Sequence, residues 1–279
     1  MTVNRLGFGA MRLTGAPSKD GRPSDRGQSV AVLRRAVELG VNHIDTAAFY
    51  FSPLRLANEL INTALAPYPD GLVIATKVGP WRDTWGAWQG MARPDQLRGQ
   101  VEENLRQLGR DHLDMVNLRT LSVSKPVGEH FAALAALRDA GQVRHLGLSN
   151  VTVAQIDEAL AIAPVAAVQN RYSIDSRRPG ADDVLRACAE RGIAFVPFFA
   201  IAGEGREDGR LTDELEPVLA ASRAHGATPA QVRLAWTLAQ GAHVLAIPGT
   251  GSLAHLAENV AAGALRLTEE ELLILGSLG

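Results

Sequence analysis

The sequence has one cysteine, Cys188, so no disulfide can form within the chain. It has no apolar run of 18 residues, the minimum for a membrane-spanning helix, and its first residues lack the pattern of a secretory signal. The 28 basic and 30 acidic residues give a formal charge of −2, which is no basis for binding nucleic acid or a membrane surface. We therefore expect a cytoplasmic protein that binds neither.

Metal-binding patterns are also missing. None of the seven histidines occurs at His-x-His or His-Glu-x-x-His spacing, so the sequence predicts no metal site. Residues 203–209 have glycines at Gly-x-Gly-x-x-x-Gly spacing, which differs from the dinucleotide-binding fingerprint. His43 lies two residues before Asp45 on the same predicted strand, and we interpret it as a satisfied core histidine rather than a ligand.

What the chain does contain is a regular alternation of short apolar strands and helices. The predicted strands are 6–11, 41–44, 72–77, 113–119, 143–149, 165–169, 193–199 and 243–247. The predicted helices are 28–39, 54–65, 94–108, 127–140, 152–162, 182–191, 214–224, 229–240, 253–261 and 269–275. Continuously apolar strands are typical of parallel sheets buried on both faces, and strict alternation implies right-handed crossovers. The pattern predicts a single (β/α)8 barrel domain over residues 1–279, with an open doubly wound sheet as the alternative.

Polar side chains follow the strands at their C-terminal ends. They are Asp45, Lys77, Arg119, Ser149, Asn150, Gln169 and Asn170, with Tyr50 just beyond. Any one of them could simply cap a strand, but in a barrel these ends meet on one rim, where such folds carry their active sites. An acid at the mouth of a buried strand needs a cationic or hydrogen-bonding partner. We expect Lys77 to be that partner for Asp45.

This set of residues suits the reduction of a carbonyl group. A lysine beside an acid stays charged, and a nearby cation favours the ionised form of a phenol. Tyr50 could therefore act as a general acid that gives its proton to a developing alkoxide. A nicotinamide cofactor is the usual source of the hydride that such a reaction needs.

The order of these residues resembles that of aldo-keto reductases along nearly the whole chain. The matching motifs are Asp45-Thr-Ala-x-x-Tyr50, Lys77 after an apolar strand, Gly147-Leu-Ser-Asn150, Val168-Gln169-Asn170, Ile247-Pro248-Gly249-Thr250 and Glu258-Asn259. The resemblance implies a (β/α)8 barrel that reduces a small-molecule carbonyl substrate with NADPH, or with NADH. It also implies that Tyr50 is the proton donor and that Asp45 and Lys77 tune it. Within the family the motifs are most similar to those of bacterial pyridoxal reductases, which favours pyridoxal or a similar aromatic aldehyde. We expect a monomer or a weak homo-oligomer.

The resemblance further implies a set of cofactor-binding residues. Ser149, Asn150 and Gln169 would hold the nicotinamide carboxamide, Phe198 would stack on its ring, and backbone N–H groups of residues 202–205 would cover the pyrophosphate. The full predicted set is Gly9, Met11, Asp45, Ser149, Asn150, Gln169, Phe198, Phe199, Ala200, Ile201, Gly203, Gly249, Thr250, Ser252, His255, Glu258 and Asn259. His255 stands where the family has a basic residue for the 2′-phosphate. Because histidine titrates near neutrality, NADPH affinity is expected to fall as the pH rises.

One residue departs from the family pattern. Arg119 stands where aldo-keto reductases normally have a histidine at the end of the fourth strand. Arginine cannot shuttle a proton, but it can stabilise negative charge growing on a carbonyl oxygen or select a substrate with an anionic oxygen. Alternatively, Arg119 only pairs with Asp45 or a loop acid. Asn117 lies two residues earlier and therefore faces the same side.

The substrate side of the pocket is predicted to include the loop 79–93, which holds three of the four tryptophans. Trp81, Trp85 and Trp88 could form an aromatic wall for a flat substrate, or they could anchor the loop to the barrel. With Tyr50, Asn117 and Arg119 they complete the predicted substrate site. Two other function classes stay open, a nicotinamide-binding sensor with little turnover and an unrelated barrel isomerase or lyase.

Overall fold

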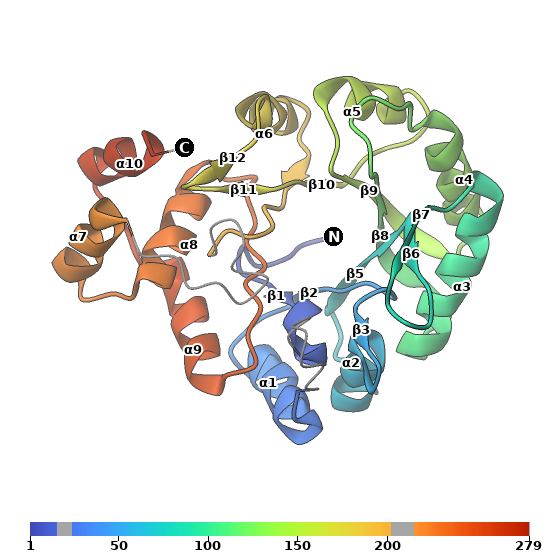
Figure 1. The fold of residues 1–279 in the computed structure, drawn as a ribbon, viewed down its shortest axis with the longest axis horizontal. Helices are drawn as coiled ribbons and strands as arrows, with labels where there is room; N and C mark the ends of the chain where they lie inside the picture. Colours follow the sequence, from blue (N-terminus) through green and yellow to red (C-terminus); the bar gives the residue numbers. More distant parts are fainter. Residues whose placement is uncertain (16–23, 202–214, 279) are drawn as a thin grey trace.

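A computed structural model describes residues 1–15, 24–201 and 215–278 of the chain. Helices surround a ring of parallel strands (Figure 1). The strands, in spatial order, are β1 (Phe8–Gly9), β2 (His43–Asp45), β5 (Val73–Val78), β8 (Leu113–Arg119), β9 (Val143–Ser149), β10 (Ala167–Gln169) and β13 (Ala194–Phe195). Every neighbouring pair in this order is parallel. The alternation of strands and helices in the sequence therefore produces a parallel sheet, as predicted.

Residues 244–246 close the ring in the eighth position. Val244 bridges Phe195 of β13, and Ala246 bridges Leu6, just before β1. The Leu245 N–H donates to the Phe195 carbonyl at 2.9 Å, and the Gly7 N–H donates to the Ala246 carbonyl at 2.8 Å. The sheet is thus closed, which confirms the (β/α)8 barrel and excludes the open doubly wound sheet. The predicted strand 243–247 consists of isolated bridges in place of a regular strand.

The helices are α1 (Arg26–Glu38), α2 (Ala57–Leu65), α3 (Leu97–Leu108), α4 (Gly128–Asp139), α5 (Val153–Leu160), α6 (Ala181–Glu190), α7 (Glu216–His225), α8 (Pro229–Ala239), α9 (Leu253–Ala261) and α10 (Glu269–Gly276). Side-chain caps fix where two of them begin: the side-chain oxygens of Thr152 and Thr268 cap the N-termini of α5 and α10. Threonine is a preferred N-cap residue. Over the described ranges, none of these helices has both the length and the apolar character needed to cross a membrane.

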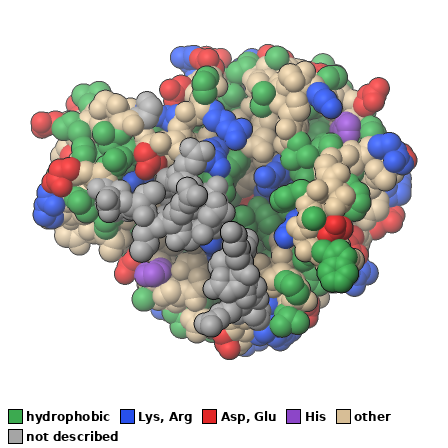
Figure 2. Space-filling model, in the orientation of Figure 1, with side chains coloured by type: hydrophobic (Ala, Val, Ile, Leu, Met, Phe, Trp, Pro, Cys, Tyr) green, Lys and Arg blue, Asp and Glu red, His purple; other side chains and the backbone are tan. Residues whose placement is uncertain are grey.

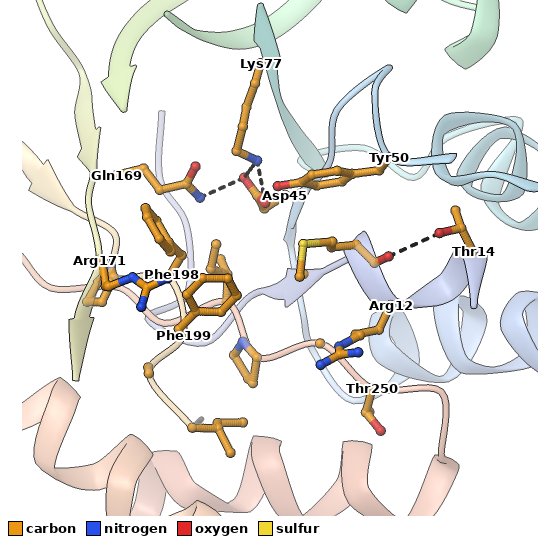
Figure 3. A pocket seen from close by; sticks show the side chains of 18 of the residues that line it. Arg12, Thr14, Asp45, Tyr50, Lys77, Gln169, Arg171, Phe198, Phe199 and Thr250 are labelled. Atoms are coloured by element: carbon orange, nitrogen blue, oxygen red, sulfur yellow. Dashed lines mark hydrogen bonds and ion pairs between the residues drawn. The ribbon is translucent and has the colours of Figure 1, made fainter. Parts of the chain in front are cut away.

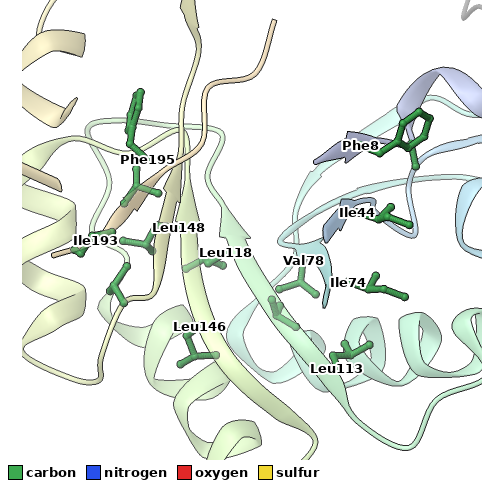
Figure 4. Packing of buried hydrophobic residues seen from close by; sticks show 14 of the residues in the cluster. Phe8, Ile44, Ile74, Val78, Leu113, Leu118, Leu146, Leu148, Ile193 and Phe195 are labelled. Carbon is green, nitrogen blue, oxygen red and sulfur yellow. The ribbon is translucent and has the colours of Figure 1, made fainter. Parts of the chain in front are cut away.

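The packing of the core determines which strand residues face the barrel interior. Alternate strand residues, among them Ile44, Ile74, Leu118 and Leu148, are completely or almost completely buried beneath the helices (Figure 4). Because side chains alternate along a strand, the residues between them point into the barrel. This alternation turns Asp45 to the barrel interior at the end of β2, one position after the outward-facing Ile44.

Three antiparallel hairpins project from the barrel and were not predicted. They are β3 (Phe51–Ser52) with β4 (Arg55–Leu56), β6 (Pro80–Arg82) with β7 (Trp88–Met91), and β11 (Tyr172–Ser173) with β12 (Ser176–Arg177). The segment 79–93 is therefore a hairpin in place of the predicted loop. The predicted helix 54–65 begins only at Ala57, because the residues before it pair in the β3–β4 hairpin.

Two predicted strands are too long. The prediction 6–11 is wrong at its end, where the chain turns into the 3-10 helix η1 (Met11–Thr14) after the Ala10 N–H has bonded the Asp45 carbonyl. In the prediction 193–199 the regular strand ends at Phe195, although Val196 and Phe198 still donate to the carbonyls of Val168 and Asn170 at 2.8 Å and 3.0 Å. Pro197 between them has no N–H to donate, and the left-handed backbone of Phe199, with φ 64°, ends the extended segment.

Candidate active site

A buried ion pair lies at the centre of the C-terminal rim. The Nζ of Lys77, on β5, is 2.6 Å and 2.7 Å from the two carboxylate oxygens of Asp45, at the end of β2. The Nε2 of Gln169, from β10, donates to the same carboxylate at 2.9 Å (Figure 3). All three residues are buried, with at most 5% of their surface exposed. The structure thus brings together residues from three strands that the sequence placed on one rim.

The electrostatics of the pair keep the lysine charged. Burial alone would disfavour the ammonium group, but the interactions with Asp45 and Tyr50 together outweigh it and raise the pKa of Lys77. The Lys77 Nζ also lies 4.8 Å from the centre of the Tyr50 ring, and the Tyr50 hydroxyl points toward the pair (Figure 3). A permanent positive charge therefore stands beside the one phenol of the rim.

A buried network of amides and hydroxyls supports the pair from behind. Thr46, which follows Asp45, donates to Asn58 of α2 at 2.7 Å. Thr76, which precedes Lys77, donates to Asn104 of α3 at 2.5 Å, and the two asparagines bond each other at 2.9 Å. All four side chains are completely buried. Strands β2 and β5 are therefore bonded to helices α2 and α3 one residue away from the ion pair.

A pocket of about 1060 Å³ opens above the pair. Most of the predicted site residues line it, namely Gly9, Met11, Asp45, Tyr50, Lys77, Trp88, Arg119, Ser149, Asn150, Gln169, Phe198, Phe199, Ala200, Ile201, Gly249, Thr250, His255, Glu258 and Asn259. Its volume reaches the upper end of the range for drug-sized ligands. The pocket can therefore accommodate a large ligand, such as a dinucleotide, together with a small one.

Several predicted site residues lie elsewhere. Asn117 points into the barrel below the pocket, where a Cβ added to Gly147 would lie 2.1 Å from its Oδ1. Ser252 caps α9 by accepting from the His255 N–H. Gly203 lies outside the described residues, as does the whole predicted pyrophosphate cover, 202–205.

The three tryptophans of the hairpin lie in different environments, and they do not form one wall. Trp85 is 93% exposed at the tip of the β6–β7 hairpin, so it neither lines the pocket nor anchors the hairpin. Trp81 is half exposed and does not line the pocket either. Trp88 does line it, and its ring lies 5.5 Å from that of Phe49 in an edge contact. The aromatic wall therefore consists of Trp88 and Phe49, a residue that the sequence did not single out.

Arg119 faces the pocket beside these two rings. Its guanidinium carbon lies 5.8 Å from the Phe49 ring centre and 5.9 Å from that of Trp88. Among the described residues it forms no ion pair, and its Nε has no hydrogen-bond partner. Asp45 is already bonded by Lys77 and Gln169, so the alternative that Arg119 pairs with Asp45 is wrong.

The lining is rich in arginine, which the sequence did not reveal. Arg12, Arg82, Arg171 and Arg178 join the pocket from loops and hairpins, and basic side chains surround the central hollow (Figure 2). Since Asp45 and Glu258 are the acids in the described lining, the pocket favours anionic ligands such as phosphates. Loop positions follow no period, so only the basic character of these loops could have pointed to them. Within the described ranges, no cluster of three His, Cys, Asp or Glu could hold a metal ion.

Local geometry suits a flat amide-bearing group. The Nε2 of Gln169 donates to Asp45, which leaves its buried Oε1 without a partner among the described residues and ready to accept from a carboxamide.

The backbone around the pocket is tightly packed and locally strained. Gly9 and Gly249 meet closely, since a Cβ on Gly249 would lie 2.3 Å from the Gly9 carbonyl oxygen. Asn150 and Phe199 have left-handed backbones, at φ 61° and 64°. Strain of this kind clusters at functional sites.

Comparison with known proteins agrees with this geometry. Residues 5–278 match the model of the aldo/keto reductase family. The chain is 45% identical to pyridoxine 4-dehydrogenase of Escherichia coli, over 99% of this chain and 95% of that protein. A crystal structure of a Klebsiella pneumoniae aldo-keto reductase with NADPH matches with a TM-score of 0.78 and 29% identity, covering 99% and 91% of the two chains. A thermostable aldo-keto reductase bound to the inhibitor epalrestat matches with a TM-score of 0.82 and 30% identity, covering 99% and 96%. The chain therefore belongs to the aldo/keto reductase family, a family of oxidoreductases.

Proposed function

We propose that this protein acts as a single barrel domain that reduces an aldehyde with NADPH, with Tyr50 as the proton donor. The observation that carries the proposal is the buried Lys77–Asp45 pair directly beside the Tyr50 phenol at the rim of a large cationic pocket. The NADPH complex of the Klebsiella relative supports the choice of cofactor. NADH is the alternative.

The residues present fit such a cofactor. Gln169 would accept from the nicotinamide carboxamide through its unpartnered Oε1, with Ser149 and Asn150 beside it. Thr250 and His255, at the other end of the pocket, would contact the adenosine part. When bound, the nicotinamide supplies a hydride to the carbonyl carbon.

The protein residues supply the proton and hold the charges. Tyr50 would donate its phenolic proton to the oxygen that is becoming an alkoxide. Lys77 is held by Asp45, so its charge needs no rearrangement as the phenolate forms, and preorganised charge of this kind is a strong source of catalysis. Asp45 is in turn oriented by Gln169.

The substrate that fits best is a flat aromatic aldehyde with an anionic oxygen, as in pyridoxal. Trp88 and Phe49 offer an aromatic surface, and Arg119 lies beside both rings with a buried Nε that has no partner in the described structure. A guanidinium in this position could bind the phenolic oxygen beside the aldehyde. The similarity to pyridoxine 4-dehydrogenase points the same way.

The experiment compares the wild-type protein with Tyr50→Phe and follows NADPH absorbance with pyridoxal and with benzaldehyde. Loss of the phenolic proton should reduce kcat by about 10²- to 10⁴-fold, the usual contribution of a general acid, while NADPH binding stays unchanged. A preference for pyridoxal that is lost in Arg119→Met would support the role of Arg119. Equal turnover of both aldehydes would refute the substrate assignment, and full activity in Tyr50→Phe would refute the mechanism.

A nicotinamide-binding sensor is the second candidate. Arg119 favours it, because an arginine in the place of the usual histidine cannot move a proton. Tight NADPH binding without turnover of any aldehyde would support this function, and Arg119→His would then be expected to gain activity.

A further inference from the structure

The hairpin β6–β7 packs against the loop that holds Tyr50 through the ring of Trp88, and the side chain of Arg82 hydrogen-bonds to that loop. Its Nη1 donates to the carbonyl oxygens of Phe49 and of Phe51, both at 3.2 Å. These are the residues immediately before and after Tyr50. One guanidinium nitrogen thus bonds the backbone on both sides of Tyr50, the residue that we propose as the proton donor.

The Arg82 side chain is itself held on several sides. Its Nε donates to the Gly86 carbonyl at 2.7 Å, and its guanidinium lies over the rings of Phe51, at 4.6 Å, and Trp88, at 5.6 Å. Gly86 has φ +86°, and a Cβ there would lie 2.6 Å from the Arg82 Nη2. The turn of the hairpin is therefore shaped around the guanidinium, and the Arg82 side chain has little freedom to move.

The other bonds of the loop do not duplicate this role. The Tyr50 N–H donates to the Ala47 carbonyl, and the Tyr50 carbonyl accepts from the Ala57 N–H, each at 3.0 Å. These bonds use the peptide groups of Tyr50 itself. The flanking carbonyls of Phe49 and Phe51 accept from Arg82, so without it they would lose a charged partner, and such bonds are stronger than neutral ones.

We propose that Arg82 is a positioning residue that keeps the Tyr50 phenol beside the Lys77–Asp45 pair. Through Arg82 the wall residue Trp88 and the proton donor Tyr50 belong to one rigid unit, so the substrate wall and the acid are set by the same contact. The inference rests on the proposed function in one respect, namely that Tyr50 gives the proton. Lysine would be a poor replacement, because a single ammonium lacks the planar fork of arginine.

The test uses Arg82→Gln and Arg82→Lys in the full chain, with Arg93→Gln as a matched control. Arg93 is a neighbouring arginine with a side chain 67% exposed that pairs only with nearby Asp95 among the described residues. We expect kcat with pyridoxal to fall by up to about 100-fold in Arg82→Gln, the effect of a misplacement of about 1 Å. NADPH affinity should fall much less than kcat, because the Nε and Nη1 of Arg82 bond backbone carbonyls. Arg82→Lys should recover little, and added guanidinium ion should restore part of the activity of Arg82→Gln. Arg93→Gln should behave as wild type.

Amide hydrogen exchange provides a readout that does not depend on turnover. In Arg82→Gln the amides of Tyr50 and Ala57 should exchange faster, while the strands of the barrel keep their protection. Unchanged exchange at these amides would overturn the proposal, as would a kcat equal to that of the wild type. If the wild-type protein shows no Tyr50-dependent turnover, the proposed function fails, and the exchange of these two amides still decides whether Arg82 positions the loop.

Discussion

His43 gives the sharpest quantitative prediction of the structure. It points into the barrel from β2, is 6% exposed, and faces Gly7 so closely that a Cβ there would lie 2.2 Å from its ring. Neither ring nitrogen has a hydrogen-bond partner among the described residues. The interpretation of a core histidine is therefore right about its position, but wrong in expecting its nitrogens to be satisfied.

Burial without a partner lowers the pKa of His43 from 6.5 to about 4. The unfolded chain takes up a proton near pH 6.5 and the folded protein does not, so the free energy of unfolding is highest above pH 6.5 and falls as the pH drops toward 4. Linkage gives a loss of about 2 kcal/mol between pH 7.5 and pH 5. The full loss is about 3 kcal/mol below pH 4, at 1.36 kcal/mol for each unit of pKa difference.

The assay is urea unfolding of wild-type protein and of His43→Leu at pH 7.5 and pH 5. Groups elsewhere titrate alike in both proteins, so the difference between them isolates His43. The wild type should lose about 2 kcal/mol more than the variant over this range. The substitution His255→Gln, at an exposed histidine, should leave the wild-type pH dependence intact. Equal pH dependence in wild type and His43→Leu would refute the reasoning.

Three further predictions concern the active site. Lys77→Met should lose turnover and destabilise the fold by about 3–5 kcal/mol in urea unfolding, because Asp45 is left buried without its cation; Asp45→Asn in the same chain should recover part of that stability. His255→Arg should tighten NADPH binding in fluorescence titrations without changing NADH binding. Trp88→Ala should raise the Michaelis constant for pyridoxal while Trp85→Ala leaves it unchanged, and equal effects of the two would contradict the observed pocket wall.

The parts of the fold that the sequence predicted well are the strands and helices of the closed barrel. Strands β8 and β9 and helix α9 were predicted to the residue, because their apolar patterns are set by burial against the barrel. The hairpin β6–β7 was missed since its strands are short and largely exposed. Without a buried face, a strand leaves no alternating pattern of apolar residues.

Only some residues of the candidate site could be predicted from the sequence. Asp45, Lys77 and Gln169 could be predicted to meet, because the ends of parallel strands in a barrel converge on one rim. Arg82 and Phe49 could not, because they reach the pocket from segments whose course follows from tertiary contacts. Those contacts, rather than the strand ends, set the wall of the pocket and the position of the acid.

The sequence placed Arg119 correctly at the pocket but could not decide which group it contacts. Its place at the end of β8 predicted that it faces the pocket, where it could have neutralised Asp45 or served the substrate. In the structure Asp45 is bonded by Lys77 and Gln169, and Arg119 lies beside two aromatic rings. A cation over aromatic faces keeps its outward N–H groups available. In the proposed mechanism Lys77 and Arg119 therefore have separate roles, since the charge of Lys77 would serve the proton of Tyr50 and that of Arg119 would be left for the substrate.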